Sequence, residues 1–334
     1  MTSPVPASAR EHQISVVIPV YSGEAHLSAV VEELAASTQT ITSPGGRSYR
    51  VTEVLLVHDG GRDNSAHVMR DLAAKFEFVR PLWLSRNFGQ HAATLAGIAS
   101  SGGEWVVTMD EDGQHDPVAM GVMLDVALDQ QARVVYAQPT GEHPHSWFRN
   151  LTSRGAKRLT NMLSGGADAS LFHSYRLMLG EVARSIAAYS GSGVYLDIAL
   201  GWVVGRAATA PVAMRDEGRT STYSLRLLMS HFRRMVLSAG TRGLRLVSLL
   251  GVVLALVGIV LAGYIVVQRI VNPAPVQGWS SMMVVVLLSS GAVLFSLGVV
   301  SEYIGVTVNT ALGKPLYLLT QDPAEGPLGR DQRP

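Results

Sequence analysis

The sequence predicts an open α/β sheet with helices on both faces, followed by two membrane-spanning helices. In the first half, short continuous apolar runs alternate with segments of helical spacing. This βαβ succession is typical of buried parallel strands covered by helices. Near the C-terminus, Leu246–Val267 and Ser280–Ser301 each hold 22 residues without a charge. Roughly 20 apolar residues suffice to cross a bilayer as a helix.

Composition agrees with this prediction and excludes several classes of function. Hydrophobic residues make up 47% of the 334 residues and charged residues 16%, whereas about a quarter of residues are charged in soluble domains. The net charge of +1 gives no indication of nucleic acid as a partner. The absence of cysteine excludes disulfides, thiolate metal sites and cysteine nucleophiles. Residues 1–12 lack an apolar signal segment, and we expect a disordered tail there.

The first half contains five predicted strands and four predicted helices in alternation. The strands are the apolar runs Ile14–Val20, Glu53–Val57, Phe78–Leu84, Glu104–Met109 and Arg133–Ala137. The helices have apolar residues at helical spacing and lie at Glu24–Ser37, Ser65–Phe76, Gln90–Ser101 and Pro117–Gln130.

Polar residues follow the first four of these strands, in the sequences PVYSGE, HDGGRD, SRNFGQH and DEDGQHD. Ligands of open α/β sheets bind beyond the carboxyl ends of the strands. No G-x-G-x-x-G follows the first strand and no Walker lysine loop is present. Mg²⁺ and Mn²⁺ commonly bridge one or two carboxylates to substrate phosphates. We therefore expect a nucleotide held partly through a divalent cation.

The two apolar runs form a predicted helical hairpin, because the short loop between them contains Pro273 and Pro275. Basic residues flank the outer ends of the hairpin, whereas the connecting loop carries only Arg269. Both termini should therefore face the cytoplasm. Residues 225–245 mix apolar residues with arginines, which predicts amphipathic helices on anionic lipid. Residues 147–163 are either a second such helix or an ordinary surface helix.

The order of the motifs PVY…E, DGG.D, SRNFGQHAA…AG and DEDGQHDP resembles the family-two glycosyltransferases of the GT-A fold. With RDEGRTSTYS, LRLVSLLG and EYIG around the hairpin, the closer resemblance is to the membrane-anchored polyprenyl-phosphate glycosyltransferases, over roughly Ile14 to Leu319. That resemblance implies a GT-A (Rossmann-like) catalytic domain at 13–224, juxtamembrane helices at 225–245, a transmembrane hairpin at 246–301 and a cytoplasmic tail at 302–334. A homo-oligomer is an open alternative by the same analogy.

The resemblance implies nucleotide-sugar contacts at matching positions, namely Pro19, Tyr21, Glu24, Asp59, Gln90, Asp110 and Glu111. Asp110 and Asp112 occupy the Asp-x-Asp motif, which implies a Mg²⁺ or Mn²⁺ site with Asp112 as the direct ligand. His115 is either a further ligand or a loop residue. Asp59 alternatively forms an Asx turn, and Tyr21, Glu24 and Gln90 alternatively serve packing or capping.

The resemblance also implies basic residues beside a lipid-phosphate acceptor. Arg149, Arg154 and Arg176 match family arginines that contact either the reacting phosphates or only lipid headgroups. The planar fork of arginine pairs well with phosphate oxygens. A loop that closes over the donor and acceptor phosphates is implied at Arg215, Arg219, Thr220, Ser221 and Tyr223, where either Thr220 or Ser221 takes the family's serine position.

The sequence departs from the family pattern at three more places. Gly61 lacks the hydroxyl found in the usual D-G-S, and His143 and His145 are the nearest substitutes for a missing arginine. Ser174 stands where many relatives carry an Asp proposed as catalytic base. A phosphate monoester is largely ionised at pH 7, so it needs no base to become a nucleophile. The expected catalytic residues remain Asp112, Arg149, Arg154, Ser174 and Arg176.

Together these features predict an enzyme that moves a sugar from a nucleotide sugar, with a UDP-sugar as the expected donor, to polyprenyl phosphate with inversion at the cytoplasmic face of the cell membrane. A processive polysaccharide synthase is disfavoured, because the Q-x-x-R-W motif and further spans are absent. The alternative is a non-catalytic nucleotide- or lipid-binding scaffold of a glycan assembly or flippase complex.

Overall fold

A computed structural model of the chain describes residues 10–140, 171–191, 195–204, 207–215, 242–271 and 278–325. All five predicted strands are present, as β1 (His12–Val20), β3 (Ser48–His58), β4 (Val79–Leu84), β5 (Trp105–Thr108) and β6 (Val134–Pro139). The four predicted helices are present as α1 (Leu27–Ala36), α2 (Ser65–Lys75), α3 (Gln90–Ser100) and α4 (Ala119–Asp129). The predicted α/β class is therefore confirmed.

The sheet is mixed rather than purely parallel. Its strand order in the described residues is β8-β6-β7-β5-β1-β3-β4-β9, and the short β2 (Ile41–Thr42) pairs with β3. The pairs β1–β3, β1–β5 and β3–β4 are parallel, as the continuous apolar runs predict. Four short strands were not predicted, namely β2, β7 (Arg176–Leu179), β8 (Ala208–Val212) and β9 (Leu319–Thr320). Of these, β7 runs antiparallel to both β5 and β6.

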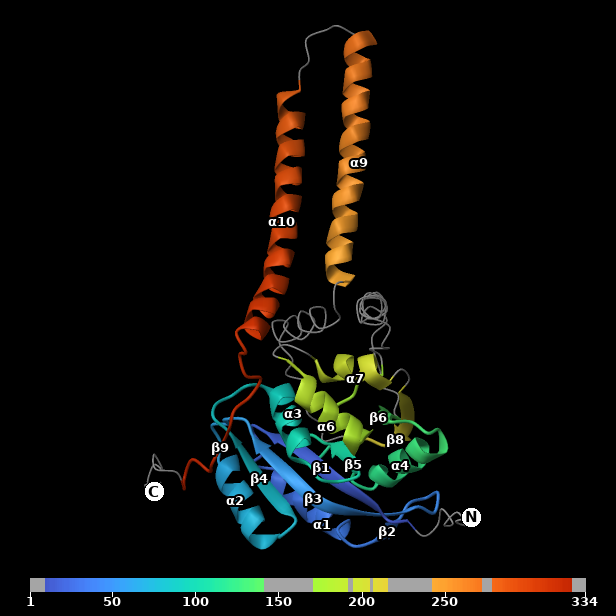
Figure 1. The fold of residues 1–334 in the computed structure, drawn as a ribbon, viewed down its shortest axis with the longest axis vertical. Coiled ribbons are helices and arrows are strands. Elements are labelled where there is room, and N and C mark those ends of the chain that lie inside the picture. Colours follow the sequence, from blue (N-terminus) through green and yellow to red (C-terminus); the bar gives the residue numbers. More distant parts are fainter. Residues whose placement is uncertain are drawn as a thin grey trace.

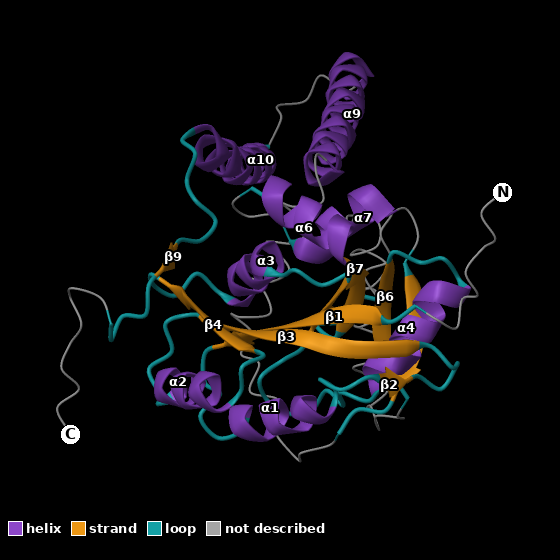
Figure 2. Cartoon of the chain, turned by 60° about the horizontal axis from the view of Figure 1, so that its bottom comes forward, coloured by secondary structure: helices purple, strands orange, loops and turns teal. Residues whose placement is uncertain are grey.

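Two helix layers cover the two faces of the sheet (Figure 2). On one face, α1, α2 and α4 pack their apolar residues onto the sheet in one core cluster, with α4 over β6, β7 and β8. On the other face, α3 packs with α6 (Gly180–Tyr189) and α7 (Leu196–Val204) in a second cluster. Both views show this second layer on the side of the domain from which the two long helices extend (Figures 1 and 2).

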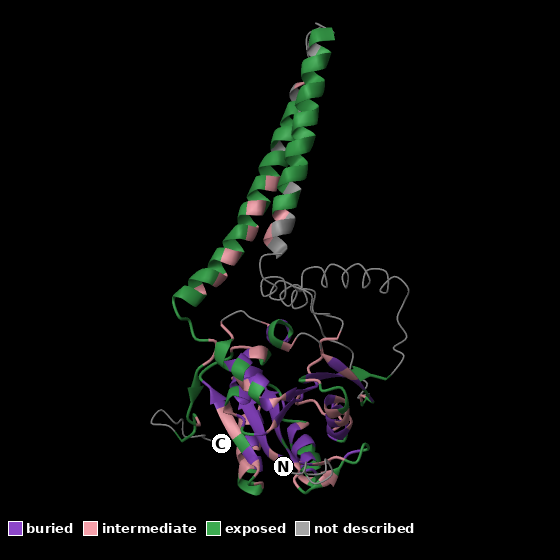
Figure 3. Cartoon of the chain, turned by 45° about the vertical axis from the view of Figure 1, so that its right-hand side comes forward, coloured by how far each residue is buried: buried purple, intermediate pink, exposed green. Residues whose placement is uncertain are grey.

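The two long helices are α9 (Arg242–Val271) and α10 (Trp279–Ala311). Each contains a segment long and apolar enough to cross a membrane, Val247–Gln268 and Met282–Ala311, and neither segment is buried against the protein. Figure 3 shows both helices exposed along almost their whole length. Exposed apolar surface of this extent is unfavourable in water, so it indicates an apolar partner.

The segment after α10 is not the separate tail expected at 302–334. The helix continues to Ala311, and Leu319–Thr320 then pairs with Trp83 and Leu84 as the edge strand β9. Arg70 on α2 binds Asp322 through two hydrogen bonds of 2.6 and 2.7 Å. Residues on both sides of the two long helices therefore belong to one sheet.

Candidate active site

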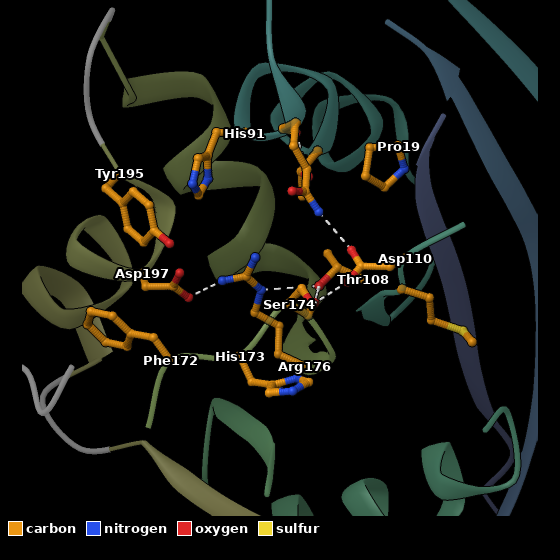
Figure 4. Close-up of a pocket in the computed structure, with 13 residues that line it drawn as sticks. Pro19, His91, Thr108, Asp110, Phe172, His173, Ser174, Arg176, Tyr195 and Asp197 are labelled. Atoms are coloured by element: carbon orange, nitrogen blue, oxygen red, sulfur yellow. Dashed lines mark hydrogen bonds and ion pairs between the residues drawn. The ribbon is translucent and has the colours of Figure 1, made fainter. Parts of the chain in front are cut away.

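A cavity of about 300 Å³ lies at the carboxyl ends of β1 and β5, where the sequence predicts ligand binding (Figure 4). Its walls come from the end of β1, the start of α3, the end of β5, the entry to β7 and the start of α7. The lining residues are Pro19, Gln90, His91, Thr94, Thr108, Met109, Asp110, Phe172, His173, Ser174, Arg176, Tyr195 and Asp197. Of the predicted site residues, Pro19, Gln90, Asp110, Ser174 and Arg176 therefore lie together.

Asp110 is held on both of its carboxylate oxygens. Gln90 Nε2 donates to Oδ1 over 2.7 Å, and the hydroxyl of Ser174 donates to Oδ2 over 2.6 Å. The backbone N–H of Asp110 donates to His115 Nδ1 over 3.0 Å. These contacts fix the orientation of the carboxylate. They also give Ser174 a function that an aspartate at this position would not perform, because two ionised carboxylates would repel each other.

Asp112 is the predicted metal ligand, and its environment fits that role. The residue is half-buried, and its Oδ1 accepts the backbone N–H of Gln114 over 3.1 Å. In the parts of the chain that the structure describes, no group of three or more His, Cys, Asp or Glu side chains could hold a metal alone. One or two carboxylates completed by substrate phosphates is the usual arrangement for Mg²⁺, and Asp112 with Asp110 suits it.

His115 resembles the loop residue rather than the metal ligand of the two alternatives. Only 4% of its surface is exposed, and its ring stacks on Tyr175 with centroids 4.7 Å apart. Because Nδ1 accepts the backbone N–H of Asp110 and burial lowers the pKa of the ring, His115 is neutral. It holds the backbone at the start of the acidic turn through its hydrogen bond with Asp110.

Glu111 and Glu24 hold loops together and do not line the cavity. The carboxylate of Glu111 accepts the backbone N–H groups of Tyr21 and Ser22 at 2.9 Å, and burial raises its pKa. The backbone N–H of Glu24 donates to Asp63, while its own carboxylate accepts the N–H of Asn64. These contacts match the capping alternative for Glu24 and give Glu111 the same kind of role.

Asp59 is 3% exposed and binds the loop that begins α3. Its two oxygens accept the backbone N–H groups of Phe88 and Gly89 over 2.7 and 2.8 Å, and burial raises its pKa. Because Gln90 follows directly, Asp59 sets the position of a residue that binds Asp110. The structure thus favours a positioning role over direct contact with a ligand.

Gly61 has a structural reason to differ from the serine of the family pattern. A Cβ atom at this position would lie 2.0 Å from the carbonyl oxygen of Tyr21. We expect Gly61→Ser to lower the free energy of unfolding by about 1–3 kcal/mol, as overpacking does. Gly102→Ser is the control, because its Cβ would meet only Glu53 at 3.6 Å. Thermal unfolding in detergent measures both; equal stability of the two variants would contradict the packing argument.

Arg215 lies outside the cavity and pairs with acidic side chains. It binds Glu33 at 2.7 Å and Asp116 at 3.4 Å, and its backbone N–H donates to Gln114. The start of the predicted phosphate loop therefore lies against the acidic turn of β5. The candidate helix 147–163, residues 225–241, His143 and His145 lie outside the described residues. So do the other predicted acceptor and catalytic residues, namely Arg149, Arg154, Arg219, Thr220, Ser221 and Tyr223.

Four lining residues of the cavity, beside the starts of α7 and β7, were not predicted from the sequence. Asp197 and Tyr195 lie at the start of α7, and Phe172 and His173 precede β7. One signal was present for Asp197, because it is the single charge in the apolar run YLDIALGWVV. A lone carboxylate in a buried helix needs a partner, which here is Arg176.

Three histidines predict how stability depends on pH. Burial lowers the pKa of His58 and His115, and lowers that of His173 to about 4. Between about pH 4 and 6.5 the unfolded chain therefore binds protons that the folded domain does not, so stability falls as pH falls through this window. The raised pKa values of Asp59 and Glu111 act in the opposite direction, but on carboxyl groups that titrate from a lower starting value.

We accordingly expect the midpoint of thermal unfolding to decrease from pH 7 to pH 5. His173→Gln should reduce this decrease, whereas His67→Gln, at an exposed position on α2, should not. A melting midpoint that stays constant over this range would contradict the prediction.

A mixed α/β sheet with an acidic motif at the end of a central strand and a cavity beside it defines a GT-A-type domain. A comparison with protein-family profiles gives the family within that class. The profile described as glycosyl transferase family 2 matches residues 15–186. Because this match spans more than half of the 334 residues, the chain belongs to glycosyl transferase family 2. It is a nucleotide-sugar glycosyltransferase of the GT-A type.

A comparison with solved structures finds glycosyltransferases of low sequence identity. Glucosyl-3-phosphoglycerate synthase from Mycobacterium tuberculosis, in complex with UDP, matches 69% of this chain and 80% of its own at 15% identity and a TM-score of 0.50. A second structure of that enzyme, with Mn²⁺, UDP and glucosyl-3-phosphoglycerate, has a TM-score of 0.49 over the same shares at the same identity. S. aureus TarS in complex with UDP-GlcNAc matches 68% of this chain and 66% of its own, at 15% identity and a TM-score of 0.44.

Proposed function

We propose that this protein transfers a sugar from a nucleotide sugar, most simply a UDP-sugar, to polyprenyl phosphate at the cytoplasmic face of a membrane. A lipid acceptor is supported by the hairpin of α9 and α10, because the apolar segments of these helices are not buried against the protein. The helix layer nearest this hairpin contains α3 and α7, which also line the cavity (Figures 1 and 4). An acceptor anchored in the bilayer would therefore approach the domain from the cavity side.

In this proposal, Asp112 and Asp110 hold a Mg²⁺ or Mn²⁺ ion together with the donor diphosphate. A bound divalent cation supplies charge neutralisation of the departing diphosphate. Gln90 and Ser174 keep the Asp110 carboxylate in one orientation, so little reorganisation is needed when the donor arrives. Asp59 contributes indirectly, because it fixes the loop that carries Gln90.

The transfer step needs no general base. An oxygen of the lipid phosphate attacks the anomeric carbon, a new C–O bond forms, and the bond from that carbon to the diphosphate breaks, which releases the nucleoside diphosphate. In-line attack from the face opposite the leaving group inverts the anomeric configuration. Since the phosphate is already ionised at pH 7, Ser174 has no proton to accept. Arg149, Arg154 and the loop at Arg219 are the proposed source of positive charge for the two phosphates.

The test uses purified protein in detergent with polyprenyl phosphate, Mn²⁺ and a panel of nucleotide sugars, followed by mass spectrometry of the lipids. A sugar-phosphate lipid from one donor, absent with unphosphorylated polyprenol, supports the proposal and identifies the sugar. Transfer to a water-soluble acceptor would keep the glycosyltransferase and reject the lipid acceptor. Nucleotide binding without any transfer would favour the scaffold.

The proposed topology has its own test, because the chain contains no cysteine. Single cysteines are introduced at Pro275, between the two helices, and at Asp129 on the surface of the catalytic domain. In intact cells, a membrane-impermeant maleimide should label the Pro275→Cys variant. It should label the Asp129→Cys variant only after the cells are lysed. Labelling of Asp129→Cys in intact cells would reverse the orientation.

A further inference from the structure

The wall of the cavity contains a buried ion pair. The guanidinium of Arg176 binds the carboxylate of Asp197, and neither residue is more than 4% exposed. The hydroxyl of Tyr136 donates to Asp197 Oδ1 over 2.8 Å, and Nε of Arg176 donates to Thr108 over 3.1 Å. Figure 4 shows the pair at the cavity beside Tyr195. Residues from β5, β6, β7 and α7 thus hold the pair in place.

The pair changes what Arg176 offers to a ligand. An unpaired arginine would attract a phosphate or a carboxylate, but pairing with Asp197 cancels its charge. Arg176 is the only Lys or Arg among the described residues that line the cavity. His173 on the same wall is neutral at pH 7, because burial lowers its pKa to about 4. Among the described residues, the lining therefore offers no unpaired cation to an anionic group on the sugar, and the Arg176–Asp197 pair instead presents hydrogen-bond donors and acceptors side by side.

Aromatic rings stand beside this pair. The ring of His91 meets that of Tyr195 edge-on with centroids 4.0 Å apart, and the ring of Phe172 lies 6.4 Å from that of Tyr195. Small-molecule sites typically combine such apolar walls with a few fixed polar groups. A volume of about 300 Å³ is at the small end of such sites and suits one sugar ring.

We propose that this cavity binds the sugar ring of the donor, that this sugar is uncharged, and that the Arg176–Asp197 pair recognises its hydroxyl groups. The guanidinium N–H groups donate to hydroxyl oxygens, and the carboxylate accepts from hydroxyl hydrogens. This inference rests on the proposed function, because it places the donor diphosphate at Asp110 and Asp112. It adds the class of sugar and assigns Asp197 as a specificity residue.

The test measures the affinity of UDP, UDP-glucose, UDP-galactose, UDP-N-acetylglucosamine and UDP-glucuronate by calorimetry with Mn²⁺ present. For the wild-type protein, at least one of the three uncharged sugars should bind about tenfold or more tightly than UDP-glucuronate. Asp197→Asn leaves the buried charge of Arg176 unpaired, so it should reduce that preference by about tenfold while the affinity for UDP changes little.

Two further variants separate recognition from loss of structure. The double variant Arg176→Gln/Asp197→Asn removes both charges, so it should still reject UDP-glucuronate although it binds uncharged sugars more weakly. Glu53→Gln changes another buried carboxylate, which binds Ser15 and Gly102 at the far end of the sheet. It should lower the melting temperature without altering sugar preference. If Asp197→Asn does not fold, Tyr136→Phe should give a smaller shift in the same direction.

The possible outcomes distinguish the sugar-site inference from the proposed transfer to polyprenyl phosphate. Equal or tighter binding of UDP-glucuronate by the wild-type protein, or an unchanged preference in the Asp197 and Tyr136 variants, would overturn the sugar-site inference alone. Selective sugar binding without transfer to polyprenyl phosphate would keep the inference and reject the acceptor. Failure of the wild-type protein to bind UDP would overturn both.

Discussion

Asp112→Asn is expected to lower kcat for sugar transfer by at least about a hundredfold, the scale of losing one preorganised electrostatic contact in a transition state. The substitution keeps the size of the side chain and its ability to accept the N–H of Gln114. It removes the negative charge that the proposed metal ion needs. The apparent affinity for Mn²⁺ in the presence of UDP should fall as well, which titration calorimetry measures independently of turnover.

Asp116→Asn is the matched control for this variant. Asp116 lies in the same turn and accepts the backbone N–H of Val118 over 2.9 Å, but it is not part of the Asp-x-Asp motif. We expect this variant to retain activity within about threefold of wild type, because an amide oxygen can still accept that bond and Arg215, which lies 3.4 Å from Asp116, keeps its closer pair with Glu33 at 2.7 Å. If Asp112→Asn were as active as Asp116→Asn, the metal site would have to lie elsewhere.

The second large effect is expected from Ser174→Asp, which introduces the residue type that the family resemblance implies at this position. In this chain the Ser174 hydroxyl donates to Asp110 over 2.6 Å. An aspartate at 174 would place a second carboxylate against the first, and repulsion would turn Asp110 away from the position set by Gln90. We expect kcat to fall about a hundredfold, a loss of roughly 2.7 kcal/mol of transition-state stabilisation.

Two smaller changes at the same position test this explanation. Ser174→Thr keeps the hydroxyl and should stay close to wild type, while Ser174→Ala removes one hydrogen bond to a charged group and should lose about tenfold. Steady-state kinetics with varied donor separates the effect on kcat from that on KM. An aspartate variant more active than wild type would mean that position 174 does take part in proton transfer.

Much of the fold could be predicted because the central strands are continuous apolar runs. β1, β3 and β5 are buried on both faces, and this leaves an unambiguous pattern in the sequence. The shorter strands could not be predicted in this way. β7 has four residues and β9 has two, so their identity as strands depends on the partners that they meet in the fold rather than on their own periodicity.

Where a motif follows a strand, the sequence indicates which residues lie at the cavity; where tertiary contacts decide, it does not. Asp110, Gln90 and Ser174 do meet at the cavity. Glu111 stands between two site residues in the motif, but these residues lie in a turn rather than in a strand, and the carboxylate of Glu111 binds the β1 loop. Asp197 comes from a distant helix, so sequence order gave no reason to pair it with Arg176.

The two long helices lie between two strands of the same sheet in chain order, rather than after its last strand. The chain leaves the sheet after β8 at one edge, passes through α9 and α10, and re-enters as β9 at the opposite edge. A domain on a single linker can swivel, whereas two anchorage points on opposite edges restrict its rotation relative to the helices. Truncation before α9 would also delete an edge strand and the Asp322 partner of Arg70. A water-soluble form of this enzyme therefore calls for excision of 242–311 and rejoining of the flanking segments, so that both edges of the sheet stay complete.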